Sequence, residues 1–232
     1  TSTGETEVLF TETSKPYFNV MLANLAIINE GEEFVGWSER TGWGQYYLYD
    51  NNGNLKNQIT EGYYTAGDIA KIDTTDRTLY FEGYGREEGI NPYYSQLYKV
   101  NFDGSGMERL TPQNATHNIS ASEKGNYFVD NYSRVNLPTQ SVLRNGDGEI
   151  ITRLEQTDIS QLKDIGWQAP EQFKVKAADG ATDIHGVMWK PFNFDSTKSY
   201  PIISYVYPGP QTEPFPVGFG VSDEATLAQL GF

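Results

Sequence analysis

Cysteine is absent from the sequence, which excludes a disulfide framework and a cysteine nucleophile. Histidine is scarce as well, and two isolated histidines provide no spacing of metal ligands, so we expect neither a metal nor a cofactor. Positive charge is also limited, because 17 Lys and Arg stand against 31 Asp and Glu, a net charge of -14. Such a chain repels a phosphate backbone, and its composition therefore argues against nucleic acid as a partner.

Long apolar runs are missing too. No run approaches the roughly 18 residues that a membrane-spanning helix needs, so we expect no membrane span. The best candidate, residues 20–28, is predicted to be a buried strand. The chain does not open on the charged and then apolar segments of a signal peptide, so either there is no such signal or the protein begins elsewhere.

Aromatic residues are plentiful, with 16 Tyr and 12 Phe, and they favour a globular, mostly β protein. One succession of segments occurs three times. An apolar strand at residues 33–37 is followed by an aromatic strand at 45–50, a turn at 51–54 and a return strand at 55–60. The two later copies lie at 78–82, 95–100, 103–106 and 107–111, and at 126–130, 140–144, 145–148 and 149–154.

A period of about 40–50 residues with several strands in each unit is typical of antiparallel β-propeller blades. The turns carry Asn-Gly or Asp-Gly pairs, which predict type I′ hairpins because both central residues of that turn need a positive φ. A propeller ring normally needs about 4–8 blades, so residues 1–156 predict an incomplete propeller.

The pattern changes after residue 154. Residues 157–170 predict a linker with a short helix over 158–165, closed by Gly166. Segments 171–178 and 183–190 predict a β-hairpin, and the apolar run 201–207 predicts a strand buried on both faces of an α/β sheet. A last helix is expected over 225–230, with Ser222 as its N-cap. Residues 171–232 are therefore predicted to begin a second domain.

Three motifs carry a resemblance to a known family. Residues 37–43 (WSERTGW) and 128–134 (FVDNYSR) resemble the last propeller blades of the dipeptidyl peptidase IV family. The downstream segments, from Asp179-Gly180 to the run YVYPGPQ at 205–211, are similar to the opening of that family's hydrolase domain. The resemblance covers nearly the whole chain from about Phe34, and the order of its segments is more specific than any single motif. It implies C-terminal blades of a propeller followed by the N-terminal portion of an α/β-hydrolase domain.

The resemblance implies a serine peptidase that releases Xaa-Pro or Xaa-Ala dipeptides from peptides with free N-termini. Tyr207 matches the family's tyrosine, whose hydroxyl donates a hydrogen bond to the oxyanion of the tetrahedral intermediate. Alternatively, Tyr207 is one of many tyrosines that pack at a strand end. The resemblance also implies a homodimer and a periplasmic or cell-envelope location.

The catalytic serine, aspartate and histidine are not expected in this sequence. It contains no Gly-x-Ser-x-Gly motif: Gly104-Ser105-Gly106 is turn chemistry, and residues 220–224 lack the closing glycine. In this fold the triad follows the early strands of the sheet, which would place all three residues beyond Phe232. We therefore expect a piece of a longer enzyme that is inactive alone.

Other candidate residues are expected to be structural. His117, in a segment between blades, and His185, in the hairpin, match structural positions of the family. The substrate-anchoring Glu pair and Arg of the family would lie in earlier blades, so Glu32-Glu33 and Glu87-Glu88 are predicted to be solvated. Exposed blade edges could let the chain self-associate.

Two alternatives stay open. One is a related prolyl oligopeptidase or acylaminoacyl peptidase, which shares the layout. The other is a binding or sensor module, in which the propeller is followed by a degenerate, non-catalytic hydrolase tail.

Overall fold

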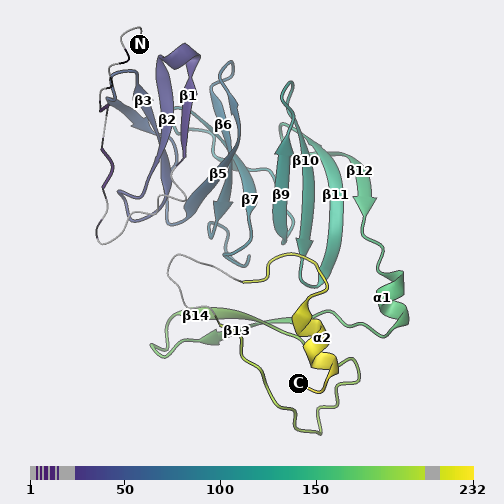
Figure 1. Ribbon diagram of the computed structural model, residues 1–232. Helices are drawn as coiled ribbons and strands as arrows, with labels where there is room; N and C mark the ends of the chain where they lie inside the picture. The colour runs from purple at the N-terminus through teal and green to yellow at the C-terminus, as the bar shows by residue number, and fades with distance from the viewer. Residues whose placement is uncertain are drawn as a thin grey trace. The chain divides into compact units, whose positions relative to one another are not determined.

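The computed structural model describes residues 4, 6, 8–9, 11–13, 15, 24–206 and 215–232. The fold is mainly β, with three four-stranded sheets whose strands follow one another in sequence order (Figure 1). The strands are β1 Leu25–Ile28, β2 Glu33–Ser38, β3 Gln45–Asp50 and β4 Leu55–Gln58; β5 Thr65–Asp73, β6 Thr78–Tyr84, β7 Gln96–Asn101 and β8 Glu108–Arg109; and β9 Thr116–Ala121, β10 Tyr127–Arg134, β11 Leu137–Asn145 and β12 Ile150–Gln156. These antiparallel meanders confirm the predicted units of several strands, and each has one strand more than the three that the sequence pattern marked.

The chain divides into two compact units. One contains residues 1–114, 119–128 and 145–149, and the other contains 115–118, 129–144 and 150–232. The predicted boundaries at residues 156 and 170 stay a prediction. No helix in the described part of the chain is long and apolar enough to cross a membrane.

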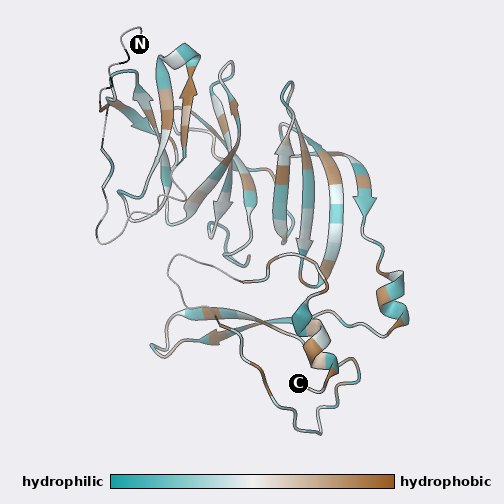
Figure 2. Cartoon of the chain, viewed as in Figure 1, coloured by the Kyte–Doolittle hydropathy of each residue, from teal (hydrophilic) through white to brown (hydrophobic). Residues whose placement is uncertain are grey.

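The core of the first unit lies between its sheets. Alternate residues of β2 and β3 face one cluster, in which Val35 and Leu48 are buried together with Leu79 and Phe81 of β6. The opposite faces of β2 and β3 are buried as well, and there Phe34 stacks on Tyr49. Figure 2 shows that apolar and polar residues both occur along the strands. Strands buried on both faces explain why the aromatic content is high.

The turn between the third and fourth strands has the same backbone in every sheet. In the last sheet the Gly148 N–H donates to the Asn145 carbonyl at 3.0 Å, and the Asn145 N–H donates to the Glu149 carbonyl at 3.0 Å. Matching bonds join Asp50, Gly53 and Asn54, and Asn101, Gly104 and Ser105.

The predicted turn type was wrong. Among the central residues only the glycine has a positive φ, +81° at Gly148, so the loops are three-residue turns that end on a left-handed glycine. A Cβ on Gly148 would lie 2.4 Å from the carbonyl oxygen of Leu110. Glycine is therefore needed for close approach to the backbone just after β8, as well as for its φ.

The first strand of the first sheet, β1, differs from its prediction. Residues 20–23 lie outside the described part, and β1 covers only the end of the predicted buried strand. Its Leu25 and Ile27 are 60% and 73% exposed, so that prediction was wrong for them. The cause is position, because β1 pairs on one side only, with β2.

After β12 the second unit contains short elements. Helix α1 spans Ser160–Asp164, and β13 Glu171–Lys176 pairs with β14 Asp183–Met188, which confirms the predicted linker helix and hairpin. Helix α2 covers Asp223–Gln229, with Ser222 at its N-cap but without a side-chain capping bond.

The strand predicted at 201–207 is not formed over residues 201–206, and Tyr207 lies outside the described residues. Ile202 is 88% exposed and Val206 is 72% exposed. A strand buried in an α/β sheet needs hydrogen-bonded neighbours, and no strand of the described chain pairs with this segment. The run is apolar enough for a buried strand, but it has no partner here.

Candidate functional site

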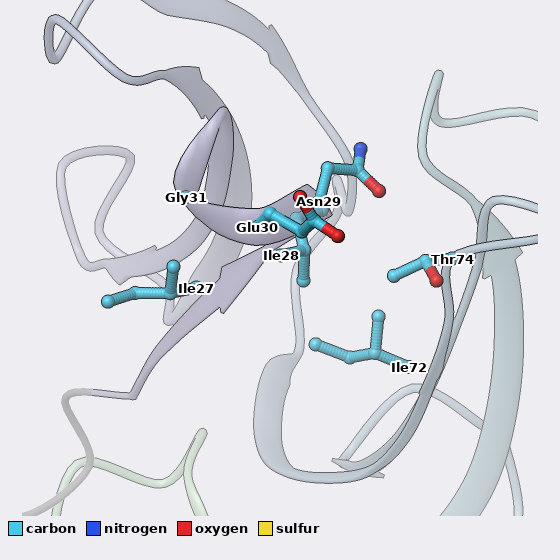
Figure 3. Close-up of a pocket in the computed structure, with 7 residues that line it drawn as sticks. All are labelled: Ile27, Ile28, Asn29, Glu30, Gly31, Ile72 and Thr74. Atoms are coloured by element: carbon cyan, nitrogen blue, oxygen red, sulfur yellow. The ribbon is translucent and has the colours of Figure 1, made fainter.

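A hollow of about 470 Å³ lies where β1 runs into β2, opposite the end of β5 (Figure 3). Ile27 and Ile28 line it from β1, and Ile72 and Thr74 line it from the other side. The loop at its rim is unusual, because Asn29 and Glu30 both have a positive φ. The Asn29 side chain donates to the Glu33 carboxylate at 2.5 Å, which holds this loop in place.

The hollow supplies little chemistry. Its polar side chains are one amide, one carboxylate and one hydroxyl, from Asn29, Glu30 and Thr74, and they do not form an acid–base pair. In the described chain no group of three or more His, Cys, Asp or Glu is arranged to hold a metal ion. The hollow is therefore a surface feature without a catalytic constellation.

Glu33, whose carboxylate is buried, forms an ion-pair network beside this hollow. Its side chain is 8% exposed and accepts hydrogen bonds from Arg77 at 2.9 and 3.3 Å, and from Lys56. The prediction of a solvated Glu32-Glu33 pair was therefore wrong for Glu33, although Glu32 is exposed. The hydrogen bond from Arg77, assisted by Lys56, holds the pKa of Glu33 at about 2 against the opposing effect of burial.

Glu33 should make stability depend on pH. The pKa of Glu33 in the folded protein, about 2, lies below the ordinary value of 4.5. Its contribution to the free energy of unfolding is therefore present above pH 4.5 and is lost as the pH falls toward 2. Because Arg77 and Lys56 are about half exposed, we expect Glu33→Gln to cost only about 1–2 kcal/mol at pH 7. Urea unfolding at several pH values measures this loss.

The free energies of unfolding of the wild type and of Glu33→Gln, plotted against pH, should converge near pH 2–3, where Glu33 becomes protonated. Glu32→Gln, at the exposed neighbouring carboxylate, is the matched control and should keep the wild-type pH dependence. A Glu33→Gln loss that stays constant down to pH 2 would contradict the assignment.

The two glutamates of the second acidic pair, Glu87-Glu88, also differ in exposure. Glu88 is exposed, as predicted, but Glu87 is half-buried and accepts hydrogen bonds from Arg86 at 2.9 Å and from the Tyr98 hydroxyl at 3.0 Å. Arg86 in turn lies over the Tyr98 ring at 5.4 Å. Glu87 thus fixes the loop between β6 and β7.

A buried polar network joins three strands of the last sheet. The Asp130 carboxylate on β10 lies 2.9 and 3.0 Å from Nδ1 of His117, and it accepts a hydrogen bond from Nε of Arg144 on β11 at 2.8 Å. All three side chains are at most 1% exposed. His117 belongs to β9, so its placement between blades was wrong.

A histidine paired with an aspartate is an arrangement that can orient a catalytic base, but no substrate could reach this pair. The side chain of His117 is fully buried, and its ring packs against Tyr132 at 5.4 Å. A structural role for His117 agrees with this burial. His185 lies on β14 and faces the ring of Phe215 edge-on at 6.4 Å, again an aromatic packing contact.

The WSERTGW motif folds into a compact anchor. The Trp37 indole donates to the Ala66 carbonyl at 2.7 Å. Arg40 lies over the Tyr47 ring at 4.3 Å and donates to the hydroxyls of Ser38 and Tyr49 at 2.9 and 2.5 Å. These contacts give Trp37 and Arg40 of the motif a structural role.

Tyr207 is the one catalytic residue that the sequence predicts, and it lies outside the described residues. Its role stays a prediction.

Known proteins resemble this chain along most of its length. A family model described as the dipeptidyl peptidase IV (DPP IV) N-terminal region matches residues 1–139. The dipeptidyl peptidase 4 of Trichophyton equinum is 27% identical over 191 residues, which covers 79% of this chain and 24% of that protein. The dipeptidyl peptidase 4 of Arthroderma otae is 28% identical over 188 residues, with coverage of 79% and 24%.

A solved structure shows the same fold. The crystal structure of Porphyromonas gingivalis dipeptidyl peptidase 4 matches with a TM-score of 0.74 at 22% identity, covering 91% of this chain and 29% of that one. The chain spans about a quarter of the length of the curated relatives that it matches.

Proposed function

The chain belongs to the dipeptidyl peptidase IV family, and from this premise we propose that it forms part of a serine peptidase that releases N-terminal Xaa-Pro or Xaa-Ala dipeptides. The observation that carries the proposal is the match of the family model to residues 1–139, because those residues contain most of the three sheets. The relatives named dipeptidyl peptidase 4 extend the similarity to 79% of the chain.

In this proposal the two parts of the chain have different tasks. The three sheets, within residues 1–156, serve as C-terminal propeller blades that border the substrate cavity. Residues 171–232 form the start of an α/β-hydrolase domain. The first elements of this segment are the strands of the hairpin β13–β14, and the last is helix α2. Residues 157–170 link the two.

Tyr207 supplies the chemistry that this sequence contributes. When the serine attacks the scissile carbonyl, negative charge develops on the oxygen, and a hydroxyl donor aimed at that position stabilises the transition state. The sequence has no Gly-x-Ser-x-Gly motif, and in this proposal the catalytic serine, aspartate and histidine all lie outside these 232 residues. We therefore propose that the chain alone does not hydrolyse peptides.

Assembly and location follow from the same proposal. All seven residues of β12 are exposed, and this edge strand is suited to pairing with another strand. We propose that the isolated chain self-associates, that the complete enzyme is a homodimer, and that it resides in the periplasm or cell envelope. Light scattering of the chain and the enzyme, and fractionation of native cells, test these three statements.

The activity is tested with a Gly-Pro chromogenic substrate, using the complete native gene product and the purified chain side by side. We expect turnover by the complete protein and none by the chain. Turnover by the chain would overturn its proposed inactivity, and an inactive complete protein would favour a binding module instead.

A further inference from the structure

The chain contains two Asn-Gly pairs, Asn52-Gly53 and Asn145-Gly146, and each lies where the third strand of a sheet turns into the fourth. Asparagine followed by glycine is prone to spontaneous deamidation, because glycine has no side chain to keep its nitrogen away from the asparagine side chain. No enzyme is needed for this reaction. The two pairs share a sequence but differ in their surroundings, so the structure decides which of them reacts.

Asn52 lies at the exposed tip of its turn. Its main-chain N–H donates to the Asp50 carboxylate at 2.9 Å, but within the described part of the chain no hydrogen bond holds its side chain. The Gly53 N–H donates to the Asp50 carbonyl at 3.1 Å. One backbone bond therefore has to open before the Gly53 nitrogen can react, in a surface turn where local opening costs little.

Asn145 is held at the end of β11 by three bonds of its side chain. Its Oδ1 accepts the N–H groups of Asp147 at 3.0 Å and of Glu149 at 2.9 Å, and its Nδ2 donates to the Glu149 carboxylate at 2.8 Å. The side chain would have to turn toward the Gly146 nitrogen in order to react, which breaks these bonds. The position is also crowded, because a Cβ on Gly146 would lie 2.8 Å from the Cβ of Asn126.

We propose that Asn52 is a site of spontaneous deamidation in the folded protein, whereas the fold protects Asn145. The Gly53 nitrogen loses its proton to the solvent and attacks the side-chain carbonyl carbon of Asn52. A succinimide ring closes as the bond to the side-chain nitrogen breaks, and this nitrogen leaves as ammonia. Water then opens the ring at either carbonyl, which gives an aspartyl or an isoaspartyl residue and adds one negative charge.

The two products should differ in their effect on the turn. Asn52 occupies the position before the turn glycine that Asp103 and Asp147 occupy in the other two sheets. An aspartyl product therefore matches the neighbouring turns and should be tolerated. An isoaspartyl product inserts one carbon into the main chain before Gly53, and it should disturb the bond from the Gly53 N–H to the Asp50 carbonyl.

The conversion of both asparagines is measured by mass spectrometry of peptides from the folded chain after incubation at mildly alkaline pH. Methyl transfer by an isoaspartyl carboxyl methyltransferase counts the isoaspartyl product separately. The reaction breaks three bonds at Asn145 but one at Asn52. Because one net hydrogen bond corresponds to up to about tenfold in rate, we expect Asn52 to convert at least about tenfold faster.

Two controls separate the effect of the fold from that of the sequence. Asn52→Gln keeps a side-chain amide but would have to close a larger ring, so it should abolish the methyltransferase signal at this position. In urea that unfolds the chain, the bonds around Asn145 are absent. The two Asn-Gly pairs should then convert at similar rates.

Conversion of Asn52 in the folded chain, with both asparagines converting in urea, is the result that we expect. An Asn52 that stays intact in the folded chain while it converts in urea would overturn the proposed site. Equal conversion of Asn52 and Asn145 in the folded chain would overturn the protection of Asn145. A difference that persists in urea would assign the selectivity to neighbouring residues in the sequence and would overturn the role of the fold.

Discussion

Asp130→Ala should destabilise the protein by about 3–5 kcal/mol, because it removes the carboxylate that pairs with a buried guanidinium. Asp130 lies 2.8 Å from Nε of Arg144, whose side chain is 1% exposed, and 2.9 Å from Nδ1 of His117. A buried charge deprived of its counterion keeps the full cost of leaving water. Equilibrium unfolding in urea measures the loss.

Asp147→Ala is the matched control for this prediction. Asp147 also pairs with a cation, Lys99 at 2.8 Å, but its side chain is 75% exposed, so the substitution should have a far smaller effect. If Asp130→Ala were as mild as Asp147→Ala, the buried network would not be a main source of stability in the last sheet.

Tyr207→Phe should lower kcat of the complete enzyme by about 10²–10³, which corresponds to about 2.7–4 kcal/mol of transition-state stabilisation. The substitution keeps the ring and removes only the hydroxyl that would donate to the oxyanion. KM should change little, because the charge develops after the substrate binds. Steady-state kinetics with a Gly-Pro chromogenic substrate measure both constants.

Tyr205→Phe provides the matched control, since it removes a hydroxyl two positions earlier in the same motif, from a residue that is 72% exposed. It should leave kcat near the wild-type value. Equal effects of the two substitutions would assign Tyr207 to packing, the alternative that its sequence position left open.

The second and third strands of each sheet could be predicted from the sequence, whereas β5 and β9 could not. Residues 45–50 carry the two-residue alternation of a strand, and β3 spans Gln45–Asp50. By contrast, β9 consists of Thr-His-Asn-Ile-Ser-Ala and is only partly buried, so it lacks a continuous apolar face. Where burial is incomplete, the hydrophobic pattern that signals a strand is weak.

The buried polar networks were also outside the reach of sequence patterns. Glu33 and Arg77 are 44 residues apart, and their contact depends on how two sheets pack. Asp130 and Arg144 are 14 residues apart and meet within the last sheet. Sequence spacing can indicate that two strands form a hairpin, but it does not predict which polar side chains of those strands, or of two packed sheets, become buried together.

The apolar run at 201–207 shows the opposite failure. Its composition predicts a buried strand, yet residues 201–206 are exposed and unpaired with any strand in the described chain. A strand forms only where a neighbour supplies the other half of its hydrogen bonds, and that information is not local.

Mass spectrometry of the first product shows whether the complete protein removes dipeptides from free N-termini. The substrate is a peptide with proline second, offered with a free and with an acetylated N-terminus. We predict release of the N-terminal dipeptide from the free peptide and no cleavage of the acetylated one. Internal cleavage would contradict this prediction and indicate a prolyl oligopeptidase. Removal of the acetylated residue would also contradict it and indicate an acylaminoacyl peptidase. No cleavage of either peptide would indicate a binding module.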